Sequence, residues 1–489
     1  MNAREARTEF RMERLTVEQL FDLLEKQEKT IRRLEAEVDR LKQRLAQYEP
    51  EIQNEMERRD APSGAGTHYS VQAEEKRRRR RKKKKSPGRR RSDLKFVDAE
   101  RHENIYPENA LPADCELARE RAVWRLENGR AVLVGYRVFR APGGVEPRIP
   151  GVTPRCEYGI EILVVLSFLV YVIGISLEKA CRVLGFFCQL PLSKSQADAL
   201  LRQLARHWEA EYDTLCDLLV HAAVVYMDET GWKVGTEGCS LWTFASKLHR
   251  VFLFGCRKDD DTLDDMLPPD IFDGVGVSDD AAVYRRRFPQ GQKCWAHLLR
   301  KAIKLTLLYP SKKTYQRFLD QLLQLYYDAK RAAADQRLSP AGRQRRVCEL
   351  ETRLCELCEP YWRQTPDMKP HERDFANLAN ELIERMMDEE LFTFVVNPEV
   401  EPTNNLTERL QRSPAQDRKA GRTSKTAAGA HRRSVIVSVL ESLRANLAQF
   451  TLQSVLDEVS RWMKEGVSLF ARQWRETSET SCEMIFDTG

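Results

Sequence analysis

Acidic side chains follow two apolar, strand-like segments that lie far apart in the chain. The segments and their acids are VVYM at 224–227 with Asp228 and Glu229, and GVGVS at 274–278 with Asp279 and Asp280. An apolar strand that ends in acids can deliver a carboxylate to a chemical site. Gly231 follows the first pair closely, so a solvated turn that simply begins with two acids fits the same local sequence.

A further acid, Glu408, lies one turn into a predicted helix in PTNNLTERLQR at 402–412. Asn404 or Asn405 can cap this helix, and glutamate in a first turn also stabilises the helix dipole without any further role. Three carboxylates in one cleft would repel one another and raise their pKa values unless cations share the space. Hard oxygen ligands suit Mg²⁺ or Mn²⁺, and two such ions can assist phosphoryl transfer.

The chain resembles transposases of the insertion sequence sixty-six family in four blocks that occur in the same order. The blocks are MDETGW at 227–232, VSDDAAVY at 277–284, KCWAHLLRK at 293–301 and VEPTNNLTERLQR at 400–412. The resemblance extends over roughly residues 156–450 and implies an α/β fold with a ribonuclease H-like catalytic core, in which a mixed sheet has flanking helices. It also implies a DDE triad on Asp228, Asp279 and Glu408, with two Mg²⁺ or Mn²⁺ ions as cofactors. Glu229 and Asp280 would then point elsewhere, because strand residues alternate between faces.

The activity implied by this resemblance is that of a metal-dependent DNA transposase, which cuts element ends and joins them to target DNA. The implied partners are double-stranded DNA and accessory proteins of the element, in the cytoplasm of a bacterium and close to its nucleoid. Family members commonly carry a cysteine-rich zinc module, but residues 96–155 contain only Cys115, so we expect no zinc there. That departure favours an alternative, a catalytically inactive or repurposed DNA-binding protein. A nuclease without strand transfer is a third interpretation.

Elements that would position the acids can be predicted from the hydrophobic pattern. Strands through 223–228, 241–247 and 250–256, a helix near 258–267 and a strand before Asp279 indicate a mixed sheet. The predicted segments are 221–295 as the first part of the catalytic core, 296–390 as a large all-helical insertion, 391–450 as the second part of the core, and 451–489 as a C-terminal helical tail.

Residues 156–220 are predicted to be helical. A break at CQLP, then a helix that Ser193 can cap, fits a helix-turn-helix in which Lys194, Ser195 and Gln196 meet DNA, and it fits an ordinary packed helix pair equally well. The apolar run at 162–175 is shorter than the about 20 residues of a membrane span, so we expect a buried helix and no membrane anchor. Residues 96–155 form a small mixed module to which the pattern assigns no function.

The N-terminal part has a different composition. Residues 12–49 show the heptad pattern of a coiled coil, which predicts a homodimer or higher oligomer, although an amphipathic helix packed on its own chain also fits. Residues 50–95 are polar and are predicted to be a disordered linker. Within them, residues 76–91 hold 13 basic residues, so the chain's net charge of +6 leaves −7 for the remainder. Such a tract favours nucleic acid, and it also fits a localisation signal or an inert linker.

A second basic segment, residues 409–433, surrounds the end of the Glu408 helix and is predicted to bind phosphate near the acids. A solvated surface loop is the alternative for it. We place Arg409 and Arg412 on that helix, and Arg418, Lys419 and Arg422 in the following loop. The predicted DNA contacts of both segments are Arg77, Arg78, Arg79, Arg80, Arg81, Lys82, Lys83, Arg409, Arg412, Arg418, Lys419 and Arg422. Twelve cysteines without a disulfide framework indicate a reducing cytosol.

Overall fold

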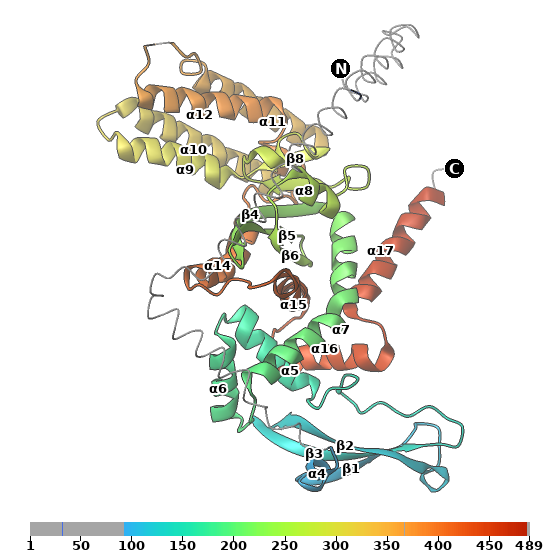
Figure 1. Cartoon of the computed structure of the whole chain (residues 1–489). Helices are drawn as coiled ribbons and strands as arrows, with labels where there is room; N and C mark the ends of the chain where they lie inside the picture. The colour runs from blue at the N-terminus through green and yellow to red at the C-terminus, as the bar shows by residue number, and fades with distance from the viewer. Residues whose placement is uncertain (1–31, 33–91, 366, 487–489) are drawn as a thin grey trace, which may run out of the picture. The chain divides into compact units, whose positions relative to one another are not determined.

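The computed structural model describes Arg32, residues 92–365 and residues 367–486 (Figure 1). The chain divides into two units, Met1–Arg89 and Arg90–Gly489. Apart from Arg32, the predicted coiled coil and the predicted basic linker up to residue 91 lie outside the described residues, and so do the tract residues Arg77, Arg78, Arg79, Arg80, Arg81, Lys82 and Lys83. The second unit is a mixed α/β structure that contains two mixed sheets and many helices.

A five-stranded sheet carries the two strand-associated acid pairs. Its strands are β4 (Val224–Val234), β5 (Glu237–Ala245), β6 (Arg250–Cys256), β7 (Val275–Ser278) and β8 (Gln290–Lys293). The spatial order is β6-β5-β4-β7-β8. Strands β4, β5 and β6 are antiparallel neighbours, whereas β4, β7 and β8 run parallel. Two short helices, α8 (Asp260–Met266) and η3 (Ala282–Tyr284), flank β7 in sequence.

Two hydrophobic cores lie on the two faces of this sheet. Val225 and Met227 of β4 belong to one core, together with residues of α7 (Lys194–Val220) and α15 (Ala427–Asn446). The residue between them, Tyr226, belongs to the other core, which the helices after β8 complete. Alternation of side chains along β4 therefore fixes which face each of its acids reaches.

Helix α15 covers the edge strand β6. The backbone N–H groups of Arg250, Phe252 and Phe254 donate to the hydroxyls of Ser442, Ser438 and Ser434, each at 2.9 Å. Serines four residues apart on one helix face meet N–H groups two residues apart on a strand, because both spacings are close to 6 Å. These contacts satisfy the free backbone donors of the edge strand.

The strand that carries Asp228 is longer than the sequence pattern predicted. We expected β4 to end in its acids, but it continues to Val234 and forms a hairpin with β5. Its pairing with β7 ends earlier, at Tyr226 opposite Val277. Asp228 therefore lies in the middle of β4, just beyond the end of its parallel neighbour.

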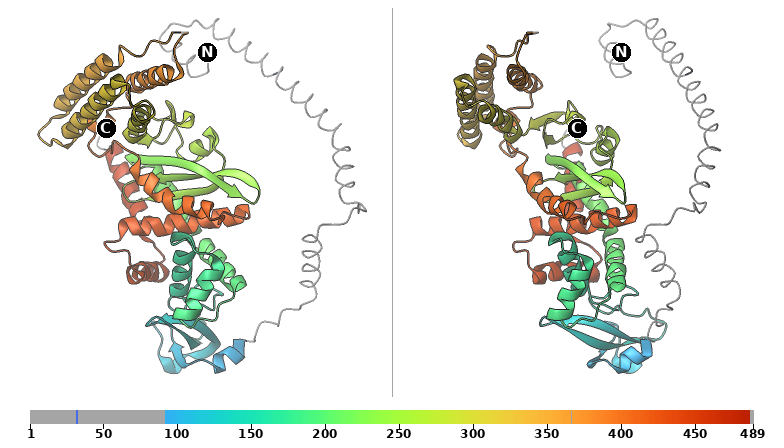
Figure 2. Two further views of the ribbon diagram at one scale, coloured as in Figure 1. Left: turned by 90° about the vertical axis from the view of Figure 1, so that its left-hand side faces the viewer. Right: turned by 60° about the vertical axis from the view of Figure 1, so that its left-hand side comes forward.

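A helical segment separates β8 from the Glu408 helix, α14 (Asn405–Lys419). Its helices are α9 (Trp295–Leu308), α10 (Lys313–Ala334), α11 (Pro340–Cys358), α12 (Pro370–Met387) and α13 (Thr393–Val396). They enclose a core that includes Phe318, Leu322 and Phe375 and that is continuous with one face of the sheet. Figure 2 shows these helices grouped beside one end of the five-stranded sheet.

The remaining elements precede the sheet or follow α15. A three-stranded sheet with the order β1-β3-β2 is preceded by α4 (Ser92–Val97). The other elements are β1 (Arg101–Ile105), η1 (Pro112–Asp114), β2 (Glu116–Glu127), β3 (Arg130–Arg140), α5 (Ile160–Ser167), the π-helical turn η2 (Phe168–Val172), α6 (Leu177–Phe187), α16 (Leu452–Glu465) and α17 (Leu469–Phe486). The predicted cap is confirmed, because Ser193 forms a capping box with Gln196 at the start of α7. Among the residues that the structure describes, no helix has the length and apolar character to cross a membrane.

Candidate active site

The two acids of β4 point to different surroundings. Glu229 accepts a hydrogen bond from the Tyr284 hydroxyl and pairs with Lys258, so its carboxylate is already engaged. Asp228 is half-buried and is the residue of this pair that interacts with Asp279 and Glu408. The two acids therefore have different partners, although the negative charge of Glu229 still acts on Asp228.

The acids that follow β7 are also separated. Asp279 accepts the backbone N–H of Ala281 through Oδ1 at 2.9 Å, which fixes its side chain close to the strand end. Asp280 turns towards the helical segment, where its Oδ1 lies 2.7 Å from Nε of Arg385. Asp279 is therefore the acid of this pair that remains beside β4.

Glu408 is held near Asp228 by the residue that begins its helix. Asn404 is fully buried at the N-cap position of α14, but its side chain caps no backbone N–H of that helix. Its Nδ2 instead donates to the carbonyl of Met227 at 2.6 Å, one residue before Asp228. Its Oδ1 accepts from the Thr407 hydroxyl, also at 2.6 Å. Asn404 thereby ties the start of α14 to the centre of β4.

The electrostatic result of this arrangement is concentrated on Asp228. Burial, followed by the negative charges of Glu229, Asp279 and Glu408, raises the pKa of Asp228 from 3.8 to about 7. Asp279 and Glu408, which lie 51 and 180 positions after Asp228 in the chain, are therefore close enough for their charges to act on Asp228. A half-buried group of carboxylates with a raised pKa is a common property of functional sites.

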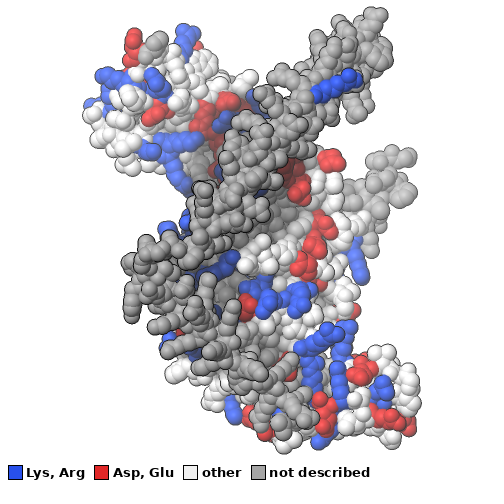
Figure 3. Space-filling view, viewed as in Figure 1, with Lys and Arg blue, Asp and Glu red and all other residues white. Residues whose placement is uncertain are grey.

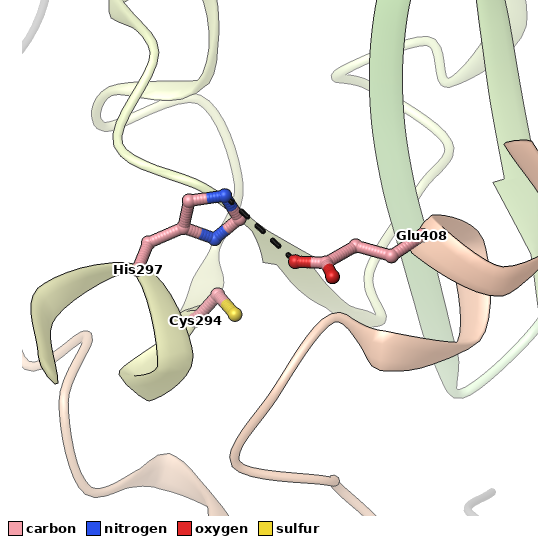
Figure 4. Close-up of side chains that lie close together, drawn as sticks. All are labelled: Cys294, His297 and Glu408. Atoms are coloured by element: carbon pink, nitrogen blue, oxygen red, sulfur yellow. Dashed lines mark ion pairs between the residues drawn. The ribbon is translucent and has the colours of Figure 1, made fainter. Parts of the chain in front are cut away.

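Side chains of the KCWAHLLRK block, at the start of α9, also lie close to Glu408. Cys294, His297 and Glu408 offer ligand atoms that all lie within 4.8 Å of one another (Figure 4). The Cys294 sulfur, however, accepts the backbone N–H of Asn404 at 3.2 Å, and burial raises the pKa of its thiol. His297 Nε2 lies 3.8 Å from Glu408 Oε1. Glu408 is the member of this group that offers the hard oxygen donors that Mg²⁺ and Mn²⁺ prefer.

A buried ionic cluster supports the β7 and β8 ends from the helical segment. Arg385 of α12 is 1% exposed and contacts Asp280 and Asp388, each at 2.7 Å. Lys293 of β8 is 2% exposed and lies 3.6 Å from Glu390, and burial lowers the pKa of this lysine. The sequence analysis did not identify Arg385, because a single arginine inside an amphipathic helix carries no signal of a partner more than 100 residues away.

The basic residues around α14 divide into exposed and engaged groups. Arg409, Arg412 and Lys419 are exposed. Arg418 donates to Thr230 Oγ1 at 2.9 Å and to the carbonyl of Gly231, and Arg422 pairs with Asp417. Arg418 and Lys419 lie in the last turn of α14, so our placement of them in the following loop was wrong.

Helix α14 continues beyond Pro414, as far as Lys419. Asp417 is buried and binds both Arg422 and Arg433, which stabilises this last turn.

On the face of the molecule in Figure 3, basic and acidic side chains of the described residues are interspersed.

The helix pair that precedes the sheet presents few free polar groups at the predicted contact point. Lys194 and Ser195 are exposed at the start of α7. Gln196 is engaged, because its amide caps Ser193 and donates to the Tyr158 hydroxyl at 3.2 Å. Buried residues along α7, from Ala197 to Leu219, pack in the same core as α15, so this helix is also a structural element of the unit.

A comparison with protein-family models bears on the identity of this chain. A family model described as Transposase IS66 family matches residues 155–432, more than half of the 489 residues. The chain belongs to the IS66 transposase family. A search of curated proteins found no match.

Membership of the IS66 transposase family implies transposase activity, with DNA as the substrate and strand breakage and joining as the reaction. The resemblance in the four sequence blocks is thereby confirmed at the level of the family. The matched range begins before α5 and ends within α15, so it includes the whole five-stranded sheet, the helical segment and α14.

Proposed function

We propose that the chain is a DNA transposase with a ribonuclease H-like core and a DDE triad of Asp228, Asp279 and Glu408. Three antiparallel strands joined to two parallel ones in a single sheet support this core, because an acid in the central strand then lies beside the acid that ends its parallel neighbour. The large helical segment from α9 to α13 is in this proposal an insertion between the second and third acids.

The three carboxylates suit hard divalent cations. Their donor atoms are all oxygens, which Mg²⁺ and Mn²⁺ prefer. Burial and then the neighbouring negative charges raise the pKa of Asp228, and a bound cation would offset that negative charge. Two such ions, when bound, supply activation of the attacking oxygen and stabilisation of the leaving oxygen in phosphoryl transfer. Asp228, Asp279 and Glu408 would hold them.

Other residues of the chain fix the positions of these ligands. Asn404 aligns α14 with β4 through the Met227 carbonyl, and the Ala281 N–H orients Asp279. The buried Arg385 holds Asp280 and so the turn after β7. The single observation that carries the proposal is that β7 ends in Asp279 beside β4 while Asn404 bonds the start of the Glu408 helix to the residue before Asp228.

Double-stranded DNA, as element ends and as target, would approach along basic residues. In this proposal the exposed Arg409, Arg412 and Lys419 contact phosphates next to Glu408, while the tract at 76–91 adds affinity independent of sequence. The helix pair α6 and α7 remains a candidate for reading the element end. Self-association through 12–49 would bring two catalytic units to one DNA complex.

Strand cleavage and strand transfer with element-end DNA and Mg²⁺ or Mn²⁺ test the proposal. Glu408→Gln retains the side-chain shape and removes one ligand charge, so both activities should fall by several orders of magnitude, since about 1.4 kcal/mol of lost transition-state stabilisation is tenfold in rate. Asp228→Asn and Asp279→Asn should behave alike, whereas Glu229→Gln should be milder. Glu399→Gln, an exposed acid nearby, is the matched control.

DNA affinity should persist in Glu408→Gln, because the variant loses a negative charge that faces phosphates. Full activity of Glu408→Gln would contradict the triad. A wild-type protein that binds DNA but never cuts it would instead favour the repurposed DNA-binding protein.

A further inference from the structure

An arginine occupies the carboxylate that the proposed metal site needs. Nη2 of Arg300, on α9, donates to both oxygens of Glu408, at 2.8 and 3.0 Å. Its Nη1 lies 3.2 Å from Nε2 of His297. A guanidinium can only donate, so His297 accepts through Nε2 and carries its ring proton on Nδ1. Arg300 is thus bound between Glu408 and His297.

A guanidinium and a divalent ion compete for the same oxygens. Mg²⁺ binds carboxylate oxygens at about 2.0–2.1 Å and requires nearly ideal octahedral geometry. With both Glu408 oxygens directed at Arg300, an ion on Glu408 would face a second cation a few ångströms away. Arg300 must therefore move, at least from one oxygen, before Glu408 can complete a metal site with Asp228 and Asp279.

Arg300 has the freedom to move, in contrast to the arginine that supports the neighbouring turn. The Arg300 side chain is 53% exposed and that of Glu408 is 25% exposed. Arg385, which holds Asp280, is 1% exposed and surrounded by carboxylates. Only an arginine of the first kind can exchange its partner without unpacking the protein.

We propose that Arg300 is a latch: it holds Glu408 in the metal-free protein and transfers to a DNA phosphate when the divalent ion binds. This inference rests on the proposed function. A guanidinium binds a phosphate with the same two-pronged geometry that it uses for a carboxylate, and the DNA backbone is the phosphate source at this site.

The latch makes DNA binding and metal binding favour each other. An ion on Glu408 releases Arg300, and DNA that offers a phosphate to the released guanidinium lowers the free-energy cost of binding the ion. Thermodynamic linkage requires the two effects to be equal in size. The site would then bind its metal ions more tightly on DNA than in the free protein.

Titration of the full-length protein with Mn²⁺, followed by the electron paramagnetic resonance of free Mn²⁺, tests this directly. Without DNA, Arg300→Ala should bind Mn²⁺ about fivefold more tightly than the wild type, which corresponds to about 1 kcal/mol at about 1.4 kcal/mol per tenfold. Arg346→Ala is the matched control, because Arg346 is 55% exposed and also pairs with a glutamate, Glu349. It should bind Mn²⁺ as the wild type does.

The same titration with a duplex of arbitrary sequence measures the coupling. The wild type and Arg346→Ala should gain about fivefold in Mn²⁺ affinity beyond any gain of Arg300→Ala, after subtraction of Mn²⁺ bound by DNA alone. With Mn²⁺ present, the slope of the logarithm of DNA affinity against the logarithm of salt concentration should be shallower for Arg300→Ala than for the wild type, by about 0.9, because the variant neutralises one phosphate fewer. Without Mn²⁺ the slopes should agree.

Unchanged or weaker Mn²⁺ binding by Arg300→Ala without DNA would overturn the latch. Arg300 would then have no effect on Mn²⁺ affinity, or it would orient Glu408 for the ion. Arg300→Gln, which retains the length of the side chain, provides a second variant if the alanine variant fails to fold. Asp228→Asn separates this inference from the proposed function. If it leaves Mn²⁺ binding unchanged, the metal site itself is wrong and the latch falls with it; if it abolishes binding, failure at Arg300 refutes the latch alone.

Discussion

Removal of the charge on Asp228 should stabilise the protein in the absence of divalent ions. Burial and three neighbouring carboxylates raise the pKa of Asp228 from 3.8 to about 7 in the folded state. For an acid with a raised folded pKa, the stabilising contribution is present below the unfolded value and is lost as the pH rises through the folded value. The ionised carboxylate therefore opposes folding above about pH 7.

The magnitude follows from the size of this shift. A difference from 3.8 to about 7, at about 1.4 kcal/mol per unit, gives an upper limit of about 4 kcal/mol. Asp228 is half-buried, so solvent screening reduces the expected value to about 2 kcal/mol. Asp228→Asn has nearly the same shape and no charge, and it should be more stable than the wild type by about this amount near pH 8. The difference should become small near pH 4.

Urea unfolding with a chelator present, at several pH values from about 4 to 8, measures the effect. Asp320→Asn, which removes an exposed carboxylate on α10, controls for the change in net charge. Saturating Mg²⁺ or Mn²⁺ near pH 8 should stabilise the wild type by about 2.7 kcal/mol at one hundred times the dissociation constant, and the variant by much less. A variant that is less stable than the wild type near pH 8 would refute the crowding of carboxylates at this position.

Three further perturbations address the parts that support the acids. Asn404→Ala should lower strand cleavage at least tenfold and weaken Mn²⁺ binding, because α14 loses its bond to the Met227 carbonyl, and a cleavage assay with Mn²⁺ titration would detect both. Arg385→Met should destabilise the protein by about 3 kcal/mol or more, since it leaves buried carboxylates without their cation, and unfolding in urea would show this. Deletion of residues 76–91 should reduce the salt dependence of DNA binding by about 0.9 for each phosphate that the tract neutralises, and an unchanged slope would make the tract a signal or a spacer.

The sequence was most informative where a pattern of residue types is typical of one structure. Apolar segments that lead into acids predicted β4 and β7, and side-chain alternation separated Asp228 from Glu229. The sequence was less informative about element ends. Nothing local shows that β4 continues beyond its acids, because the hairpin with β5 depends on pairing across the whole sheet. Nothing local shows that α14 continues through Pro414 either, because proline ordinarily ends or bends a helix.

Partners of the acids could not be predicted from the chain, and the reason is physical. Arg300 and Arg385 lie on amphipathic helices whose charged residues are ordinarily solvated, so neither differs locally from its neighbours. Their partners, Glu408 and Asp280, are more than 100 residues away, and pairing follows from how the helical segment packs against the sheet. Asn404 could be recognised as a helix start, but its bond to Met227 requires the position of β4.

The helical segment between β8 and α14 therefore contributes to the site that it interrupts. Helix α9 begins beside Cys294, whose sulfur accepts the N–H of Asn404, and Asn404 holds the strand residue next to Asp228. The same helix presents Arg300 to Glu408, and α12 presents Arg385 to Asp280. A short linker in place of the segment would remove both groups of interactions. In the proposed site, this segment of the chain is thus in position to influence when Asp228, Asp279 and Glu408 act together.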